Sequence, residues 1–206
     1  MTQLLLIRHG ENEYTRSGKL AGWTPGVHLN DAGQKQAEAL AKRLTLAPIT
    51  AIYSSPLERA RETAAPLAKV KGLKVEISSG LGEVRYGNWT GKSLKRLART
   101  KLWDVVQRHP SAMEFPEGES LWNVQARVVE AIEHIARAHP KDLVAAFSHG
   151  DIIKLAVAYY LGMPLDLFQR IMISTASITL LHFGHGQTAL VKLNDTGPFA
   201  LDGRGK

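Results

Sequence analysis

The sequence of 206 residues contains no cysteine. Disulfide bonds and metal sites built on thiolates are therefore excluded, and the absence fits the cytoplasm, where we expect this protein. Apolar runs are also short, because none approaches the ~18 residues that a membrane-spanning helix needs. Residues 1–8 lack the basic segment with which a secretory signal peptide begins. We interpret them as a buried strand and expect no association with membranes.

Acidic residues are outnumbered, with 19 Asp and Glu against 26 Lys and Arg, which gives a formal net charge of +7. Such a charge suggests a nucleic-acid ligand. However, most basic residues are interleaved with Asp and Glu, and no nucleic-acid-binding motif is present, so we expect no nucleic-acid partner. A predicted helical segment without acids is the exception, and it contains Lys92, Lys95, Arg96, Arg99 and Lys101. Its basic face is either a solvated surface or a positive rim that attracts a small anionic substrate.

Strand-like and helix-like segments alternate along the chain. Apolar runs at residues 4–7, 50–53, 75–77 and 143–147 predict buried strands, and two further β-like runs follow at 176–183 and 187–193. Amphipathic helices are expected between them, the first of which is capped by Asn30 or Asp31. This alternation predicts an α/β fold, a three-layer αβα sandwich with a mostly parallel central sheet.

The chain is long enough for one domain, and we expect a single domain over residues 1–206. The stretch at about 80–118 predicts a small helical and loop cap inserted over the core, with a helix over residues 93–108. The glycine-rich tail at about 195–206 is expected to be flexible. The two C-terminal strands offer an edge through which a homodimer would form.

Residues 54–59 predict a sharply defined helix start. Ser55 stands as the N-cap, Pro56 as the first helical residue, and Glu58 closes a capping box. Arg59 then lies in the first turn of this helix. Arg61, two positions later, is the alternative candidate for a functional arginine. The structural alternative is that Arg59 lies on the surface and pairs with a neighbouring glutamate.

Two His-Gly pairs each follow a predicted buried strand, His9-Gly10 after the first strand and His149-Gly150 after the fourth. In open parallel sheets, ligands bind beyond the carboxyl ends of the strands. Both histidines are therefore expected at the ligand-binding edge. A metal site built on His149 and Asp151 is not favoured, because two ligands at that spacing occur often by chance.

Taken together and in order, short motifs along nearly the whole chain resemble those of the histidine phosphatase superfamily, in the branch that includes the cofactor-dependent phosphoglycerate mutases. They comprise Arg8-His9-Gly10-Glu11, Gly22-Trp23, residues 29–37, 54–64 and 83–91, Gly118-Glu119-Ser120, and Ser148-His149-Gly150.

The resemblance implies that His9 is a nucleophile that accepts a phosphoryl group, with one ring nitrogen held protonated by a backbone carbonyl at Gly10. It also implies that Arg8, Arg59 and His149 bind the transferring phosphoryl group. Guanidinium groups suit this task, because they donate paired hydrogen bonds to phosphoryl oxygens. Since the arginines already supply positive charge, we expect neither a metal ion nor a cofactor.

By the same resemblance, Glu83 protonates the leaving group and later deprotonates the attacking water. Partial burial or a neighbouring phosphate would keep its carboxyl group neutral by raising its pKa. Glu76 and Glu119 are the alternatives, because both lie near the expected boundaries of the cap.

The chain also departs from the family pattern. Members often carry Thr or Ser after the opening Glu and Asn three positions later, whereas this chain has Asn12 and Thr15. Either residue is a candidate for binding the phosphate, and Gly22 and Tyr86 are expected to contribute to substrate binding.

The mutases carry a longer cap with paired arginines, and this chain lacks that adjacent pair in residues 92–108. A shorter cap excludes water less well, so the resemblance favours hydrolysis. We therefore predict a metal-independent phosphatase that acts on a small phosphorylated metabolite through a phosphohistidine. A cofactor-dependent phosphoglycerate mutase is the alternative, and a non-catalytic binding module is disfavoured because all five candidate catalytic residues are retained.

Overall fold

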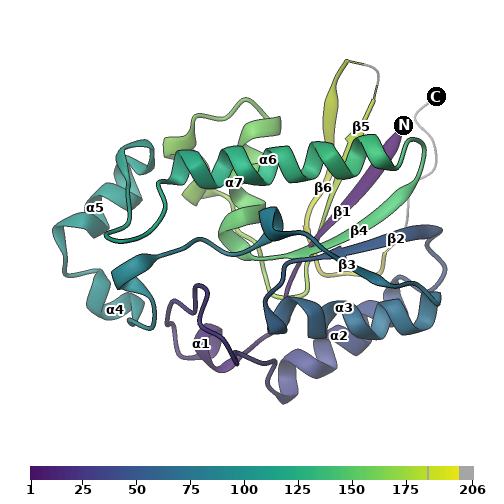
Figure 1. Ribbon diagram of the computed structural model, residues 1–206, viewed down its shortest axis with the longest axis horizontal. Coiled ribbons are helices and arrows are strands. Elements are labelled where there is room, and N and C mark those ends of the chain that lie inside the picture. The colour runs from purple at the N-terminus through teal and green to yellow at the C-terminus, as the bar shows by residue number, and fades with distance from the viewer. Residues whose placement is uncertain (185, 200–206) are drawn as a thin grey trace.

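The computed structural model of the protein describes residues 1–184 and 186–199 (Figure 1). Its six strands form one sheet in the order β3-β2-β4-β1-β5-β6. β3, β2, β4 and β1 are mutually parallel, and β5 and β6 are antiparallel to their neighbours. The prediction of an α/β fold with a mostly parallel sheet is confirmed. The strand bounds are β1 (Thr2–Arg8), β2 (Ile49–Ser54), β3 (Val75–Ile77), β4 (Leu143–Ser148), β5 (Ile178–Phe183) and β6 (Thr188–Asp195).

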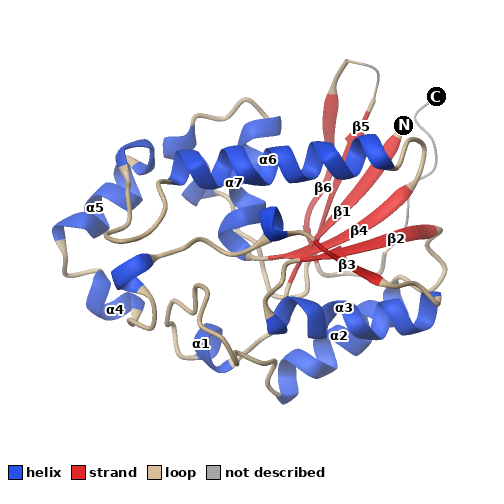
Figure 2. Cartoon of the chain, in the orientation of Figure 1, coloured by secondary structure: helices blue, strands red, loops and turns tan. Residues whose placement is uncertain are grey.

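Helices cover both faces of this sheet, as Figure 2 shows. α2 and α3 pack together on one face, and α6 and α7 pack on the other. The helix bounds are α1 (Glu13–Arg16), α2 (Asp31–Arg43), α3 (Glu58–Lys71), α4 (Leu94–Leu97), α5 (Lys101–Arg108), α6 (Leu121–Ala138) and α7 (Gly150–Tyr160). None of the helices in the described residues is long and apolar enough to cross a bilayer.

Residues 4–7 of the central strand β1 are all apolar because the strand faces two cores. Successive strand residues point to opposite faces of a sheet, so Leu4 and Leu6 join the core under α6 and α7, whereas Leu5 and Ile7 join the core under α2 and α3. All four side chains are at most 1% exposed. Each such burial stabilises the fold by roughly 1.5–3 kcal/mol, which holds β1 and the residues that follow it in the centre of the sheet.

The predicted start of α3 is wrong in detail. α3 begins at Glu58 with Leu57 as its N-cap, and no side chain caps it. The hydroxyl of Ser55 lies 2.8 Å from Nε2 of His149 and accepts a long 3.3 Å hydrogen bond from the amide of Leu57. Glu58 accepts a hydrogen bond from the amide of Gly26. Tertiary contacts therefore occupy both predicted capping side chains, yet Arg59 still lies in the first turn. At α2, Asn30 rather than Asp31 is the N-cap, since its side chain accepts from the amide of Gly33.

The single helix predicted over residues 93–108 is also wrong, because the chain forms α4 and α5 with a break between them. Leu97 and Val106 are both buried. They are nine residues apart, about two and a half turns at 3.6 residues per turn, so one continuous helix would place them on opposite sides. The break allows both to face the core. Lys92 and Arg99 consequently lie outside the helix that contains Lys95 and Arg96, and the predicted basic helix face does not form.

The predicted cap, residues 80–118, extends away from the sheet and carries α4 and α5 (Figure 1). An antiparallel bridge between Lys19 and Ser93 joins it to the loop after α1, and a second bridge, Glu114 to Ser120, closes its last turn. At the C-terminal end of the chain, Phe199 packs against the core under α2 and α3. Residues 200–206, where most of the predicted flexible tail falls, lie outside the described residues.

The loop that follows β1 is pressed against the start of α2. A Cβ atom on Gly33 would overlap the backbone of Glu11, and one on Gly10 would lie 2.7 Å from the carbonyl oxygen of Gly33. Glycine at these two positions therefore lets the backbone after His9 contact the first turn of α2 directly.

We predict that Gly33→Ala lowers the free energy of unfolding by about 1–3 kcal/mol, because its new methyl group has no room. In an unobstructed helix, the same change would raise the free energy of unfolding by roughly 1 kcal/mol. The sign of the measured change therefore shows whether the close contact is present. Thermal and urea unfolding measure the effect, with Gln34→Ala as the exposed control in the same helix turn. An equal or higher melting temperature for Gly33→Ala would contradict the close contact.

Candidate active site

The two His-Gly pairs meet at the carboxyl edge of the sheet, where β1 and β4 lie side by side. The amide of His9 donates to the carbonyl oxygen of Ser148 over 2.9 Å. The rings of His9 and His149 lie 5.1 Å apart between centroids and are 2% and 0% exposed as residues. The structure therefore brings together the two histidines that the sequence placed at the ligand-binding edge.

The imidazole of His9 has a defined tautomer. Its Nδ1 lies 2.7 Å from the carbonyl oxygen of Gly10. Because a carbonyl can only accept, Nδ1 carries the proton and Nε2 keeps its lone pair. Burial, followed by the positive charges of Arg59 and Arg8, holds the pKa of His9 well below its ordinary value of 6.5. His9 is therefore neutral at pH 7 and has the form required of a nucleophile.

Arg59 lies directly beside this nitrogen. Its Nε is 3.4 Å from Nε2 of His9, and its Nη2 donates to the carbonyl oxygen of Gly22 over 2.9 Å. The residue is only 1% exposed. Arg61 is exposed on the outer side of α3. Of the two arginines that the sequence left open, Arg59 is the one at the site.

Several buried nitrogen atoms around His9 lack a hydrogen-bond partner among the described residues. They are Nε of Arg8, Nδ2 of Asn12, Nη1 of Arg59 and Nδ1 of His149. Arg8, Asn12 and Arg59 line the same cavity as His9. A buried donor without an acceptor costs roughly 1–3 kcal/mol. An anion in the cavity would satisfy several of these donors at once.

The cap of α1 distinguishes the roles of Asn12 and Thr15. The hydroxyl of Thr15 accepts from the amide of Asn12 and donates to the carbonyl oxygen of Asn12, over 2.9 and 2.8 Å. The side-chain oxygen of Asn12 accepts from the amide of Thr15. Both residues line the cavity, but the hydroxyl of Thr15 is occupied by the helix cap. Nδ2 of Asn12 is the free donor.

Glu83 faces the histidines from the first loop of the cap. One carboxylate oxygen accepts from the amide of Val84 over 3.0 Å, and the other lies 3.7 Å from Nδ1 of His149. Burial and the negative charge of Asp151 raise the pKa of Glu83 to about 7, against the opposing charge of Arg59. The carboxyl group can therefore both donate and accept a proton near neutral pH.

The other candidate glutamates lie elsewhere. Glu76 is exposed on β3, and Glu119 forms an ion pair with Arg127. Neither lines the cavity, whereas Glu83 does.

His149 differs from His9 in its contacts. Its Nε2 lies 2.8 Å from the hydroxyl of Ser55. Burial, followed by the positive charges of Arg59 and Arg8, holds the pKa of His149 well below 6.5. A protonated His149, one of the forms considered from the sequence, is therefore disfavoured until a negative charge enters the site.

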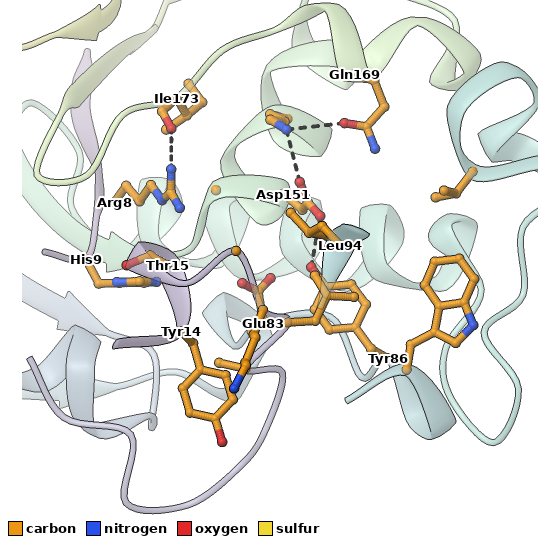
Figure 3. Close-up of a pocket in the computed structure, with 18 of the residues that line it drawn as sticks. Arg8, His9, Tyr14, Thr15, Glu83, Tyr86, Leu94, Asp151, Gln169 and Ile173 are labelled. Atoms are coloured by element: carbon orange, nitrogen blue, oxygen red, sulfur yellow. Dashed lines mark hydrogen bonds and ion pairs between the residues drawn. The ribbon is translucent and has the colours of Figure 1, made fainter. Parts of the chain in front are cut away.

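A second polar group lines the cavity (Figure 3). It contains Tyr86, which the sequence analysis named as a substrate-binding candidate, and Asp151, Lys154 and Gln169, for which no substrate contact was predicted. The hydroxyl of Tyr86 donates to Asp151 over 2.9 Å, and Lys154 donates to Asp151 and Gln169 over 3.2 and 3.3 Å. The position of Asp151 directly after His149-Gly150 was the only sequence signal for it. Gly22 is not among the lining residues and contributes through its carbonyl oxygen to Arg59.

The cavity has a volume of about 320 Å³, which suits a small molecule. Away from His9, much of its wall is apolar and comes from the loop after α1, the cap and the segment before β5. These residues are Leu20, Trp89, Leu94, Trp103, Val106, Phe115, Met172 and Ile173. No basic residue of the stretch 92–101 lines the cavity, which favours a solvated surface over a rim around the substrate. In the part of the chain that the structure describes, no group of three or more His, Asp or Glu side chains is arranged to hold a metal ion.

Comparison with known proteins places this geometry in a family. Residues 4–196 match the model of the histidine phosphatase superfamily (branch 1). Phosphoserine phosphatase 1 of Hydrogenobacter thermophilus is 31% identical over 198 residues, which cover 95% of this chain and 93% of that protein.

Two solved structures are similar over nearly their whole length. Bacillus stearothermophilus YhfR has a TM-score of 0.90 at 27% identity and covers 96% of this chain and 98% of its own. A mycobacterial glucosyl-3-phosphoglycerate phosphatase has a TM-score of 0.86 at 26% identity, with 94% and 99% covered.

We predict that the carboxyl group of Glu83 titrates near pH 7 instead of near 4.5. Asp151→Asn removes a nearby negative charge and should move this midpoint to lower pH. Carbon-13 NMR of protein labelled at the glutamate carboxyl carbon measures both midpoints, with Glu83→Gln to assign the signal and the exposed Asp104→Asn as control. An ordinary midpoint in the wild type, or no change in Asp151→Asn, would contradict the assignment.

Proposed function

We propose that this chain, which belongs to branch 1 of the histidine phosphatase superfamily and is a phosphatase, hydrolyses a small organic phosphate monoester through a phosphohistidine on His9, without a metal ion. One observation carries the proposal. Nε2 of His9 keeps its lone pair in a buried site that Arg8 and Arg59 also line, and Nε of Arg8 and Nη1 of Arg59 have no hydrogen-bond partner among the described residues.

In the first step, the phosphoryl group of the substrate binds among these donors. Nε of Arg8, Nη1 of Arg59 and Nδ2 of Asn12 would donate to its oxygens. Negative charge that develops on the transferring group is stabilised by such fixed cations, which need no rearrangement during the reaction. The dianion also raises the proton affinity of His149, which would then contribute a further donor.

Nε2 of His9 attacks phosphorus, so that a nitrogen–phosphorus bond forms and the bond from phosphorus to the ester oxygen breaks. The departing alkoxide takes the proton of Glu83, whose pKa of about 7 suits this transfer near neutral pH. The hydrogen bond from Nδ1 to Gly10 stabilises the positive charge that develops on the ring.

In the second step, water attacks the phosphohistidine, and the carboxylate of Glu83 takes its proton. The nitrogen–phosphorus bond breaks, inorganic phosphate leaves, and His9 regains its lone pair. Solvent access to the cavity supports this outcome, because the lining residues Leu94 and Met172 are 39% and 72% exposed.

A small phosphorylated metabolite is the proposed substrate class. The relatives described above include a phosphoserine phosphatase and a glucosyl-3-phosphoglycerate phosphatase. In both of the compounds in these names, the phosphate carries a compact organic group. The cavity volume of about 320 Å³ accommodates a group of this size. A panel of phosphate monoesters, assayed by phosphate release, would define the preferred member.

We predict that the wild-type protein, treated with labelled phosphate ester in EDTA, carries acid-labile and base-stable phosphate. His9→Ala should lack it and lose about four orders of magnitude or more in turnover, since the nucleophile is absent. His28→Ala, which alters an exposed histidine, is the control. Wild-type turnover in His9→Ala would refute the phosphohistidine. Loss of activity in EDTA that a divalent ion restores would refute the metal-free mechanism.

We also predict that 3-phosphoglycerate with its bisphosphate primer yields inorganic phosphate and little 2-phosphoglycerate. The reason is that the short cap provides no adjacent arginine pair to retain a sugar acid while it reorients. Phosphorus-31 NMR follows all three species in one sample. Efficient formation of 2-phosphoglycerate without phosphate release would instead support the mutase.

A further inference from the structure

We propose that Arg127 and Glu119 form a positioning pair that fixes the loop of Glu83 and so aims its carboxyl group at the leaving group. The proposal rests on the function proposed above, in which Glu83 is the proton donor. Neither Arg127 nor Glu119 lines the cavity, so both would act through Glu83 and not on the substrate.

Arg127 connects helix α6 to the backbone of this loop. Its Nη1 donates to the carbonyl oxygens of Gly80 and Gly82 over 2.9 and 2.8 Å, and its Nη2 donates to that of Glu83 over 2.9 Å. Nε and Nη2 also donate to the two carboxylate oxygens of Glu119, over 3.0 and 2.9 Å. One guanidinium group therefore donates to three carbonyl oxygens of the loop and to the carboxylate of Glu119.

Glu119 holds the other side of Glu83. Its carboxylate accepts from the amide of Arg85 over 3.0 Å, and its own amide donates to the carbonyl oxygen of Arg85 over 2.9 Å. The loop is thus bound before Glu83 by Arg127 and after it by Glu119. Because Glu119 directly follows the cap (residues 80–118) and the loop of Glu83 begins it, the pair joins the two ends of the cap.

Trp23 also binds the carbonyl group of Glu83. Its Nε1 donates to the carbonyl oxygen of Glu83 over 2.5 Å, and the guanidinium group of Arg85 lies 3.8 Å above its ring centroid. The carbonyl group of Glu83 therefore accepts from two elements, α6 and the loop after α1.

The fixed backbone determines where the carboxyl group points. One carboxylate oxygen is held by the amide of Val84, within the same loop, and the second oxygen is the one near His149. A shift or rotation of the loop would therefore move this second oxygen away from the position where the ester oxygen departs. A displacement of about 1 Å is enough to slow an enzymatic step roughly a hundred-fold.

An ordinary ion pair on the same helix provides the contrast. Arg137 donates to Glu133 over 3.3 Å, and these side chains are 68% and 44% exposed. Arg127 and Glu119 are only 22% and 18% exposed. A lysine in place of Arg127 would keep the positive charge but could not bind three carbonyl groups and a carboxylate together.

The test compares two esters of similar size whose leaving groups differ in basicity. Benzyl phosphate releases a strongly basic alkoxide that needs a proton, whereas 4-nitrophenyl phosphate releases a weakly basic phenolate that does not. For Arg127→Lys, we expect kcat/KM to fall roughly ten- to a hundred-fold with benzyl phosphate and to stay within about two-fold with 4-nitrophenyl phosphate. Arg137→Lys should change neither value. The ratio kcat/KM is used because it reports transfer to His9 and not the later hydrolysis.

Glu119→Gln is the second variant, since it weakens the pair without changing helix α6, and it should show the same selective loss. Equal losses with both esters, or no loss, in variants with wild-type circular dichroism would overturn the proposal. If Arg127→Lys does not fold, Glu119→Gln decides by the same criterion.

Glu83→Gln separates this proposal from the function on which it depends. If Glu83→Gln loses activity selectively with benzyl phosphate and Arg127→Lys and Glu119→Gln do not, only the positioning role fails. If Glu83→Gln is as active as the wild type with both esters, the proton-donor role of Glu83 fails, and the positioning role fails with it.

Discussion

The hydrogen bond from Nδ1 of His9 to the carbonyl oxygen of Gly10 is the interaction on which the rest of the site depends. It assigns the lone pair to Nε2 and directs this atom toward Arg59. The residue that accepts this bond lies in the loop that contacts α2 directly, and this contact is possible because Gly10 and Gly33 carry no side chains. The tautomer of His9, the orientation of its ring and the packing of the loop against α2 are therefore linked.

Burial favours the neutral forms of His9, His149 and Glu83, and the largest charge effect on each group adds to this. Two histidines and two arginines converge at one sheet edge, and the positive guanidinium groups favour neutral imidazoles. The pKa of Glu83 shifts upward instead, because burial and the negative charge of Asp151 favour its protonated form. The site thus combines fixed positive charge, neutral histidines and a carboxyl group that can donate a proton. The proposed hydrolysis of a phosphate ester uses all three properties.

Much of the sheet and of the candidate site could be predicted from the sequence. β1 and β4 are buried on both faces, so each contains a continuous apolar run. Parallel pairing then forces His9 and His149 to the same edge. The start of α3 and the helix at 93–108 were predicted wrongly, because local patterns do not show that Ser55 contacts His149 or that Leu97 and Val106 face the same core. The contacts of Asp151 and Arg127 were missed for the same reason, since each involves residues distant in the sequence.

The cap of α1 has a consequence for how this part of the chain can vary among relatives. Asn12 uses the oxygen of its side-chain amide to cap the helix, while Thr15 completes the cap. The nitrogen of the same amide is a buried donor that has no partner among the described residues. A change at position 12 alone would remove both contributions of the amide, and a change at position 15 alone would break the reciprocal cap. Positions 12 and 15 should therefore covary as a unit, so that Asn-then-Thr and the reverse order are two separate solutions with few viable intermediates between them.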